Sequence, residues 1–439
     1  MSDLNPLRIS RVAIDGLFRL YNHDIPLRLQ DRVTILHGPN GRGKTVLLRM
    51  LQSLFRMNFA EIARVPFDEL RVSFDDGSTL FLTHSEAPST STDRAGALSI
   101  HLDRPGPRDE AFDIPVMKRP PESNRLSPEV LLSLLGGAEG ANERDVAASV
   151  ERVMRTIMAA QQRPKVADWF KALCDRVRVH FVETQRLLQP TPAEDSRPDD
   201  KTNGKLIPTV AENARDLARR TGEVMARYAA VSQSLDRSFP QRLIQTNTLA
   251  PLSLPDLTRR LDDLEKKRRK LQLIGLLTED DNTRFDPPGL TEAQRAVLTL
   301  YVFDSEQKLA VYDEIADRVA LLLNIINKKF SAKTLRVDRR RGYFVVGHDG
   351  RALPPDALSS GEQHELVLLY NLLFRVEPGA LLLLDEPELS LHVAWQTEFL
   401  GDLIQIARRV GFDALVATHS PYVVGDRWDL TVELGAPPA

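Results

Sequence analysis

Short, continuous apolar runs are the clearest indication of secondary structure in this chain. Three of them, Val33–His37, Ala380–Leu384 and Ala414–Ala417, are apolar at nearly every position and are followed by glycine or polar residues. Runs of this length and type are typical of parallel strands that are buried on both faces. Together with Arg176–Val182 they predict a four-stranded parallel sheet, and so an α/β fold.

A second group of segments has the pattern of short strands separated by polar turns, which is typical of an antiparallel sheet. Residues 7–37 contain two or three strands with polar turns, and Asp75–Gly77 marks a hairpin turn. Strands are expected at Ile25–Leu29, Arg71–Phe74, Thr79–Thr83, Leu98–Leu102, Thr334–Asp338 and Gly342–Val346. The pattern predicts an antiparallel lobe beside the parallel sheet.

The middle of the chain has helical periodicity. Apolar residues alternate in steps of four and three at Leu217, Thr221, Val224, Tyr228, Val231 and Leu235, and at Leu257, Leu261, Leu264, Arg268, Leu271 and Ile274, with one charged break. The pattern predicts an antiparallel helical hairpin over 211–276, and two ordinary amphipathic core helices are an equal alternative. A long helix is expected over 291–329, and a mobile loop over 189–208, which is polar and rich in proline.

Composition narrows the class of protein. The chain has 439 residues, a net charge of -3 and a single cysteine, Cys174, so an intramolecular disulfide is excluded. The N-terminus lacks a basic and apolar signal region, and no apolar run reaches the length of a membrane span. We therefore expect a cytoplasmic protein without a membrane partner. The charge shows no global basic field for nucleic acid.

The run Gly38-Pro39-Asn40-Gly41-Arg42-Gly43-Lys44-Thr45 matches the phosphate-binding loop G-x-x-x-x-G-K-[ST]. An expected strand precedes it and an expected helix over 45–57 follows it, which is the context that this motif requires. Its backbone N–H groups surround phosphate oxygens, while Lys44 reaches the outer phosphates and the Thr45 hydroxyl can bind Mg²⁺. The pattern therefore predicts a nucleoside triphosphate site.

Polar residues follow the other expected strands. Asp385 and Glu386 end the Ala380–Leu384 run, and Thr418-His419-Ser420 follows the last strand. Gln185, with Glu183 as an alternative, follows Arg176–Val182. Because ligands of open α/β sheets bind beyond the carboxyl ends of the strands, these clusters should converge on the loop's ligand.

Leu358-Ser359-Ser360-Gly361-Glu362-Gln363 precedes another expected helix. By itself it is a helix capping box, with Ser360 at the N-cap and Gln363 three residues later. Its position between the loop and the carboxylate strand favours a further role.

The order of these motifs resembles that of the ATP-binding-cassette (ABC) superfamily, and most closely its soluble SMC-like and RecF-like branch. The order is the phosphate-binding loop, the Leu-Ser-Ser-Gly-Glu signature, the Leu-Leu-Leu-Leu-Asp-Glu strand and Thr-His-Ser. Glu386-Pro-Glu-Leu-Ser-Leu-His392 resembles the overcoming-lysogenization-defect (OLD) ATPases and the ATPase subunits of the Septu and PARIS phage-defence systems. The resemblance covers about 1–85 and 330–430. Arg42 departs from the small residue that is usual at its position.

The resemblance implies roles for individual residues. Lys44 and the loop amides would hold the phosphates of ATP, and Thr45, Asp385 and Gln185 would bind Mg²⁺. Glu386 would act as general base, and His419 would contact the γ-phosphate. Ser360, Gly361 and Glu362 would meet ATP bound to a second copy, so that two heads dimerise. Phe18 or Tyr21 would stack on adenine, unless they are core residues.

The same resemblance implies an ATPase head that is divided by an insertion. Its halves are expected at 1–105 and 291–439, with a mainly helical insertion at 106–290. We expect an ATP-driven switch that controls a separate effector, such as a nuclease, in anti-phage defence. The sequence runs about twenty residues beyond His419, so we expect nuclease chemistry to come from another chain.

The alternative function is a RecF-like DNA-binding ATPase. This hypothesis rests on two basic clusters that would bind the DNA phosphates, Lys266–Lys270 and Arg339–Arg341. Acidic neighbours and the flanking Leu264 and Leu271 favour a solvated helix face for the first cluster.

Overall fold

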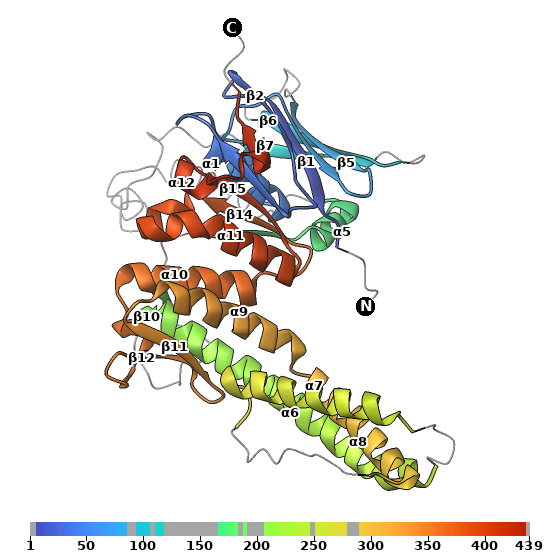
Figure 1. The fold of residues 1–439 in the computed structure, drawn as a ribbon. Helices are drawn as coiled ribbons and strands as arrows, with labels where there is room; N and C mark the ends of the chain where they lie inside the picture. The colour runs from blue at the N-terminus through green and yellow to red at the C-terminus, as the bar shows by residue number, and fades with distance from the viewer. Residues whose placement is uncertain are drawn as a thin grey trace, which may run out of the picture.

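The computed structural model describes eight stretches of the chain: 6–85, 94–105, 110–117, 166–182, 188–190, 206–245, 251–278 and 289–435. Figure 1 shows an antiparallel sheet at the top, a parallel sheet beneath it, a layer of helices below that, and a helical arm. The fold is α/β: the parallel sheet, the antiparallel sheet and the helices packed on them form a head, from which a large helical segment extends. No helix in these stretches is both long and apolar enough to cross a lipid bilayer.

The parallel sheet has the predicted strands and one more at its edge. Its order is β16 (Thr431–Glu433), β3 (Val33–His37), β15 (Asp413–Ala417), β14 (Leu381–Asp385) and β8 (Val179–Val182). All neighbouring pairs are parallel. Along β14, Leu381 and Leu383 belong to one hydrophobic core, whereas Leu382 and Leu384 belong to the other. The prediction of strands buried on both faces is confirmed.

The first core lies between the parallel sheet and the antiparallel sheet. The antiparallel sheet has the order β2 (Tyr21–Pro26), β1 (Ile9–Leu17), β4 (Glu69–Phe74), β5 (Thr79–Ser85), β6 (Arg94–Asp103) and β7 (Glu110–Met117). Helix α1 (Lys44–Phe55) fills the space between the sheets with Leu47, Leu51 and Leu54, each fully buried. The short helices α2 (Phe59–Ile62) and α5 (Asp168–Arg176) complete this core.

The second core covers the other face of the parallel sheet. It is formed by α9 (Asp313–Lys329), α10 (Ser360–Tyr370), the π-helical turn η5 (Asn371–Arg375) and α11 (Val393–Val410). A small sheet of β11 (Lys333–Asp338), β12 (Gly342–Gly347) and β13 (Ala352–Leu353) packs beside them. Short elements connect the layers: η4 (Pro355–Ala357), η6 (Pro387–Ser390), α12 (Pro421–Val424) and η7 (Trp428–Leu430).

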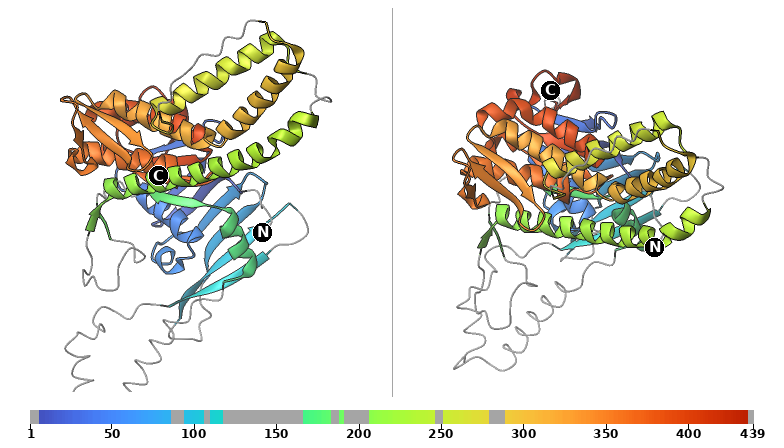
Figure 2. Two further views of the ribbon diagram at one scale, coloured as in Figure 1. Left: turned by 90° about the horizontal axis from the view of Figure 1, so that it is seen from below. Right: turned by 60° about the horizontal axis from the view of Figure 1, so that its bottom comes forward.

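Three helices form an arm that extends away from the head in Figures 1 and 2. They are α6 (Thr209–Gln245), α7 (Leu254–Leu273) and α8 (Glu292–Ala310). The predicted seam is buried at Leu217, Val224, Leu257, Leu264 and Leu271. However, α8 packs against both α6 and α7, so the expected two-helix hairpin is a three-helix arm.

The observed elements differ from the expected division in several places. The long helix expected over 291–329 is broken at Val311 and Tyr312, where Tyr312 packs on Tyr228 of α6. Helix α8 therefore packs with the arm rather than with the head. Strand β7 pairs with β6 beyond residue 105, and β8 joins the head sheet from within the expected insertion.

The loop expected over 189–208 has paired ends. Strand β9 (Leu188–Pro190) pairs with β10 (Leu206–Pro208), and 191–205 lies outside the described residues. Residues 118–165 of the insertion that was expected to be mainly helical also lie outside them. The strand expected over Arg176–Val182 begins at Val179, because α5 continues to Arg176.

Candidate functional site

The loop Gly38–Thr45 joins the carboxyl end of β3 to the first turn of α1. Gly41 and Gly43 have φ angles of 83° and 85°, which L side chains rarely adopt. A Cβ on Gly43 would lie 2.5 Å from Leu17 Cδ2, whereas a Cβ on Gly41 would meet nothing within 4 Å. Glycine is therefore required at 41 by backbone conformation, and at 43 by conformation and packing together.

Lys44 lies over the mouth of this loop. Its Nζ donates to Gly38 O at 2.7 Å and to Pro39 O at 3.2 Å, and it lies 3.3 Å from Nδ1 of His419. Burial lowers the pKa of Lys44, and the carboxylates at the end of β14 oppose that shift. The ammonium thus lies where the loop, the end of β14 and the end of β15 meet.

The carboxylates after β14 lie beside the loop, as the strand order requires. Thr45 Oγ1 donates to Asp385 Oδ1 at 3.0 Å. Glu386 has a left-handed backbone with φ 44°, a conformation that is uncommon for a residue with a side chain. Its Oε1 lies 3.5 Å from Nε2 of His419. Such backbone strain is often found at functional sites, where the surrounding structure maintains it.

Glu388 is a site residue that the sequence reasoning did not single out. Its Oε1 accepts from Thr418 Oγ1 at 2.6 Å, from the His419 N–H at 3.0 Å and from the Ser420 N–H at 3.2 Å. One carboxylate therefore holds the segment after β15 against the segment after β14. The signal in the sequence was a second acidic residue two positions after Glu386, together with hydroxyl groups on both sides of His419.

The Arg42 side chain also has contacts that the sequence did not predict. Its guanidinium donates to Leu434 O at 3.4 Å and to the carbonyl of Gly435, and it lies 5.8 Å from the centre of the Tyr21 ring. Nε2 of buried His23 lies 2.9 Å from the Arg42 carbonyl oxygen. The loop is therefore held from β2 and from the segment after β16. Tyr21, one candidate for stacking on adenine, packs against Arg42.

The signature segment lies elsewhere in the same chain. Helix α10 packs against α6 and α9, and Figure 1 places it beneath α11, away from α1. Its cap differs from the expected one, because Ser359 is the N-cap and Glu362 closes the capping box. Ser360 is thus the first residue of the helix. The Glu362 carboxylate accepts from Ser359 and from Nζ of Lys333 at 2.6 Å.

Not every expected site residue is brought together. Lys44, Thr45, Asp385, Glu386 and His419 converge, but Ser360, Gly361 and Glu362 lie on α10. Gln185 and its alternative Glu183 lie outside the described residues. Phe18, the other candidate for adenine, is partly buried against the first core.

The residues at the loop fit a nucleotide with a bound Mg²⁺ ion. Helix α1 has no side-chain cap at its N-terminus, so its first N–H groups can donate to a phosphate. Within the described stretches no cluster of three or more histidine, cysteine or acidic residues has the arrangement of a metal site. Mg²⁺ typically takes one or two protein oxygens together with phosphates and waters, and Thr45 and Asp385 supply such a pair.

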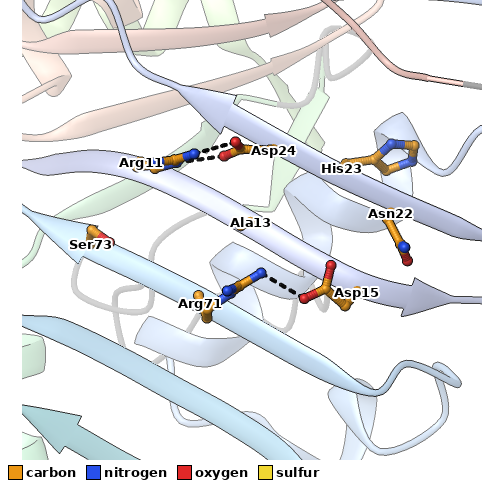
Figure 3. Close-up of a pocket in the computed structure, with 8 residues that line it drawn as sticks. All are labelled: Arg11, Ala13, Asp15, Asn22, His23, Asp24, Arg71 and Ser73. Atoms are coloured by element: carbon orange, nitrogen blue, oxygen red, sulfur yellow. Dashed lines mark hydrogen bonds and ion pairs between the residues drawn. The ribbon is translucent and has the colours of Figure 1, made fainter.

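A polar pocket of about 280 Å³ lies on the antiparallel sheet (Figure 3). It is lined by Arg11, Ala13, Asp15, Asn22, His23, Asp24, Arg71 and Ser73. Its charges form ion pairs with one another, Arg11 with Asp24 and Arg71 with Asp15. Ala13 alternates along β1 with the core residues Val12 and Ile14, so the pocket lies on the sheet face that is turned away from α1.

The loop before α1 and the carboxylates after β14 lie at the same edge of the parallel sheet, where Thr45 contacts Asp385. A family model described as "AAA domain, putative AbiEii toxin, Type IV TA system" matches residues 210–425. The match therefore includes the arm, α10, the carboxylates and His419. The search of curated proteins found no relative of the chain.

Solved structures of SMC head domains are similar to the chain at low identity. The Smc head domain of Pyrococcus furiosus, with an extended coiled coil and bound to the C-terminal domain of ScpA, is 12% identical, with a TM-score of 0.35. That match covers 95% of this chain and 91% of the other. The SMC head domain from Thermotoga maritima is 11% identical, with a TM-score of 0.33 and coverages of 95% and 92%.

Proposed function

We propose that this chain hydrolyses ATP at the loop between β3 and α1. The observation that carries the proposal is the convergence of Lys44, the Thr45–Asp385 pair and the Glu386–His419 pair at one edge of the sheet. Phosphoryl transfer needs mainly positioning and charge stabilisation, and these groups supply both. A carboxylate beside an imidazole and an ammonium is suited to activating a water.

Each residue has a distinct task in this reaction. The loop N–H groups and Lys44 hold the phosphates and offset the charge on the oxygen that leaves. Thr45 and Asp385 would hold Mg²⁺, which would supply positive charge to offset that of the phosphates. Glu386 accepts a proton as water attacks the γ-phosphorus and the bond to ADP breaks. His419 donates to the γ-phosphate, and Glu388 keeps the His419 backbone in place.

We further propose that two copies pair head to head around ATP. In one chain, Ser360 and Gly361 begin a helix that lies away from the loop. Large apolar side chains are exposed after β14 and β15, namely Leu389 and Val393 at 65% and Tyr422 at 59%. Exposed apolar residues beside a polar site are suited to an interface that forms only when the ligand is bound.

The switch would act on a separate effector, in anti-phage defence. The carboxylates of the described residues near the loop are used for nucleotide and Mg²⁺, so we assign effector chemistry to another chain. The description of the matched family as a toxin of a toxin–antitoxin system is in keeping with a defence role. Hydrolysis would separate the heads and so change the effector's state.

The alternative, a RecF-like DNA-binding ATPase, is weakened by the contacts of its main basic cluster. Each side chain of Lys266–Lys270 has an intramolecular partner: Asp263, Asp313, Tyr301, Glu265 and Asp317, respectively. Side chains that already pair within the chain offer less free positive charge to a phosphate backbone.

The proposal is tested with variants purified with the proteins encoded beside this chain. Glu386→Gln should bind ATP, hydrolyse it about 10²–10⁴-fold more slowly and remain dimeric, because the general base is lost but the phosphate contacts stay. Lys44→Ala should lose tight ATP binding. Ser360→Arg should bind ATP but stay monomeric. Glu292→Gln, on the exposed face of the arm, is the charge-matched control.

Native mass and ATP turnover give the result. A dimer of Glu386→Gln that carries a neighbouring protein supports the effector-holding switch. Unchanged turnover in Glu386→Gln would overturn the catalytic assignment. Dimerisation of Ser360→Arg with ATP would overturn the contact in trans. A dimer that retains nuclease-sensitive DNA and no protein would favour the RecF-like alternative.

A further inference from the structure

Three charged side chains from three helices meet inside the second core. Lys329 is the last residue of α9, Glu365 lies on α10 and Asp402 on α11. The Lys329 ammonium forms ion pairs with the Glu365 carboxylate and with Oδ2 of Asp402, the latter at 2.8 Å. The Lys329 and Glu365 side chains are 2% and 1% exposed, so this pair is buried, and the Asp402 side chain beside it is 17% exposed.

The triad is electrostatically unusual for a hydrophobic core. One cation faces two carboxylates, and Oε2 of Glu365 has no hydrogen-bond partner in the described part of the chain. Burial by itself would lower the pKa of Lys329, but the two carboxylates outweigh it and the pKa is raised. The charge on Lys329 also lies at the carboxyl end of α9, where the helix dipole favours a cation.

Such a triad is not the most stable way to fill this space. Replacing a buried ion pair with apolar side chains of similar volume is often neutral or stabilising, while removing one partner is costly. What a buried ion pair supplies instead is a single register between the packed elements. Residues Glu365–Tyr370 of α10 are all buried. Apolar contacts of this kind allow a helix to slide or rotate, and an ion pair does not.

The triad lies close to the proposed contact with the second head. Glu365 is four residues after Gly361, which is about one helical turn. A second lysine of the same segment, Lys333 on β11, binds Glu362 one turn earlier. The buried pair and the partly exposed Lys333–Glu362 pair thus hold two successive turns of α10, and Asp402 ties the buried pair to α11.

We propose that Lys329 is a positioning residue, which fixes α10 against α11 so that Ser360 and Gly361 meet ATP on the second copy. The inference rests on the proposed pairing of heads. Lys329 touches neither nucleotide nor metal, and acts only through the placement of α10. Helix α11 begins just after the carboxylate segment, so the triad sets the distance between the two halves of the composite site.

The test uses the full chain with the triple substitution Lys329→Met/Glu365→Leu/Asp402→Asn, which removes all three charges of the triad and so leaves no unpaired charge. The matched control is Lys308→Met/Asp236→Leu, which removes an ion pair between α8 and α6 in the arm. Both are made in the Glu386→Gln background. Hydrogen exchange of α10 and α1, ATP affinity of the monomer and the ATP-dependent dimerisation constant are measured.

The proposal expects a selective effect. Amides of α10 should exchange at least about fivefold faster and those of α1 should not change. ATP affinity should stay within about twofold, and dimerisation should weaken at least about tenfold, which corresponds to about 1.4 kcal/mol. The arm control should dimerise like its parent. A purely structural triad would instead speed exchange throughout the head and lower ATP affinity as well.

Each other outcome counts against a defined claim. Unchanged exchange in α10, or faster exchange in α10 with an unchanged dimerisation constant, overturns the positioning role. If the Glu386→Gln parent does not dimerise with ATP, the proposed pairing of heads fails. The positioning of Ser360 and Gly361 for a second copy then falls with it, whatever the exchange of α10 shows.

Discussion

Gly41 and Gly43 provide a matched pair of substitutions in the phosphate-binding loop. Their φ angles, 83° and 85°, are nearly identical, so an alanine at either position meets the same backbone strain. That strain is about 1–2 kcal/mol for an L residue in the left-handed region. Only the space around the two positions differs, because a Cβ at 43 would approach Leu17 Cδ2 to 2.5 Å.

The contact with Leu17 adds a packing cost to Gly43→Ala. A leucine at the surface would rotate away, but Leu17 is fully buried against α1. Overpacking in such a core costs about 1–3 kcal/mol. We therefore expect Gly43→Ala to destabilise the protein by about 2–5 kcal/mol and Gly41→Ala by about 1–2 kcal/mol.

Thermal melts monitored by circular dichroism compare the two variants. At about 1 °C per kcal/mol for a chain of 439 residues, Gly43→Ala should melt at least about 1 °C below Gly41→Ala. The double substitution Leu17→Ala/Gly43→Ala should be less destabilised than the sum of its parts, by about 1 kcal/mol or more, since the first change makes room for the second. Equal melting temperatures for the two glycine variants, or additive costs in the double variant, would refute this reasoning.

Two further predictions concern His23 and the basic cluster. Burial lowers the pKa of His23, so the unfolded chain takes up its proton first, and stability should fall as the pH drops below the ordinary value of about 6.5. In His23→Gln, melting temperature should depend less on pH between about 7 and 5; an unchanged slope would contradict the assignment. Lys267→Ala/Lys270→Ala removes two ion pairs between α7 and α9, which should destabilise the protein by up to about 1 kcal/mol per pair without changing DNA binding. Salt-sensitive DNA binding that this variant loses would reverse that conclusion.

Continuous apolar runs were sufficient to predict β3, β14 and β15, the three central strands of the parallel sheet, but not the edge strand β16. A strand such as β14 is buried on both faces, so its sequence has no alternation to misinterpret, and the polar residue after it marks the carboxyl end. The convergence of Lys44, Asp385 and His419 follows from strand order and strand ends alone. That part of the site was therefore accessible to sequence reasoning.

Contacts that depend on tertiary packing were not accessible. The Arg42 guanidinium binds carbonyl groups after β16, and no local pattern links residues so far apart in the chain. No proline or glycine in the sequence marks the break between α8 and α9. The chain changes direction there, where Tyr312 packs on Tyr228. Likewise, Ser359 and Ser360 both fit an N-cap in the sequence. In the structure Ser359 is the N-cap, and Lys333 binds Glu362, which closes the capping box.

The pairing of β3 also has a consequence for how the chain folds. Val33 pairs with Ala414, and Ile35 pairs with Thr431, so the strand before the phosphate loop has both neighbours near the other end of the chain. Contacts between residues so distant in sequence form slowly, because loop-closure entropy is lost first. The antiparallel sheet, by contrast, pairs mostly within the first 117 residues. During synthesis β3 therefore lacks both of its neighbours until β15 and β16 have been made, so the proposed phosphate site can be completed only after that point.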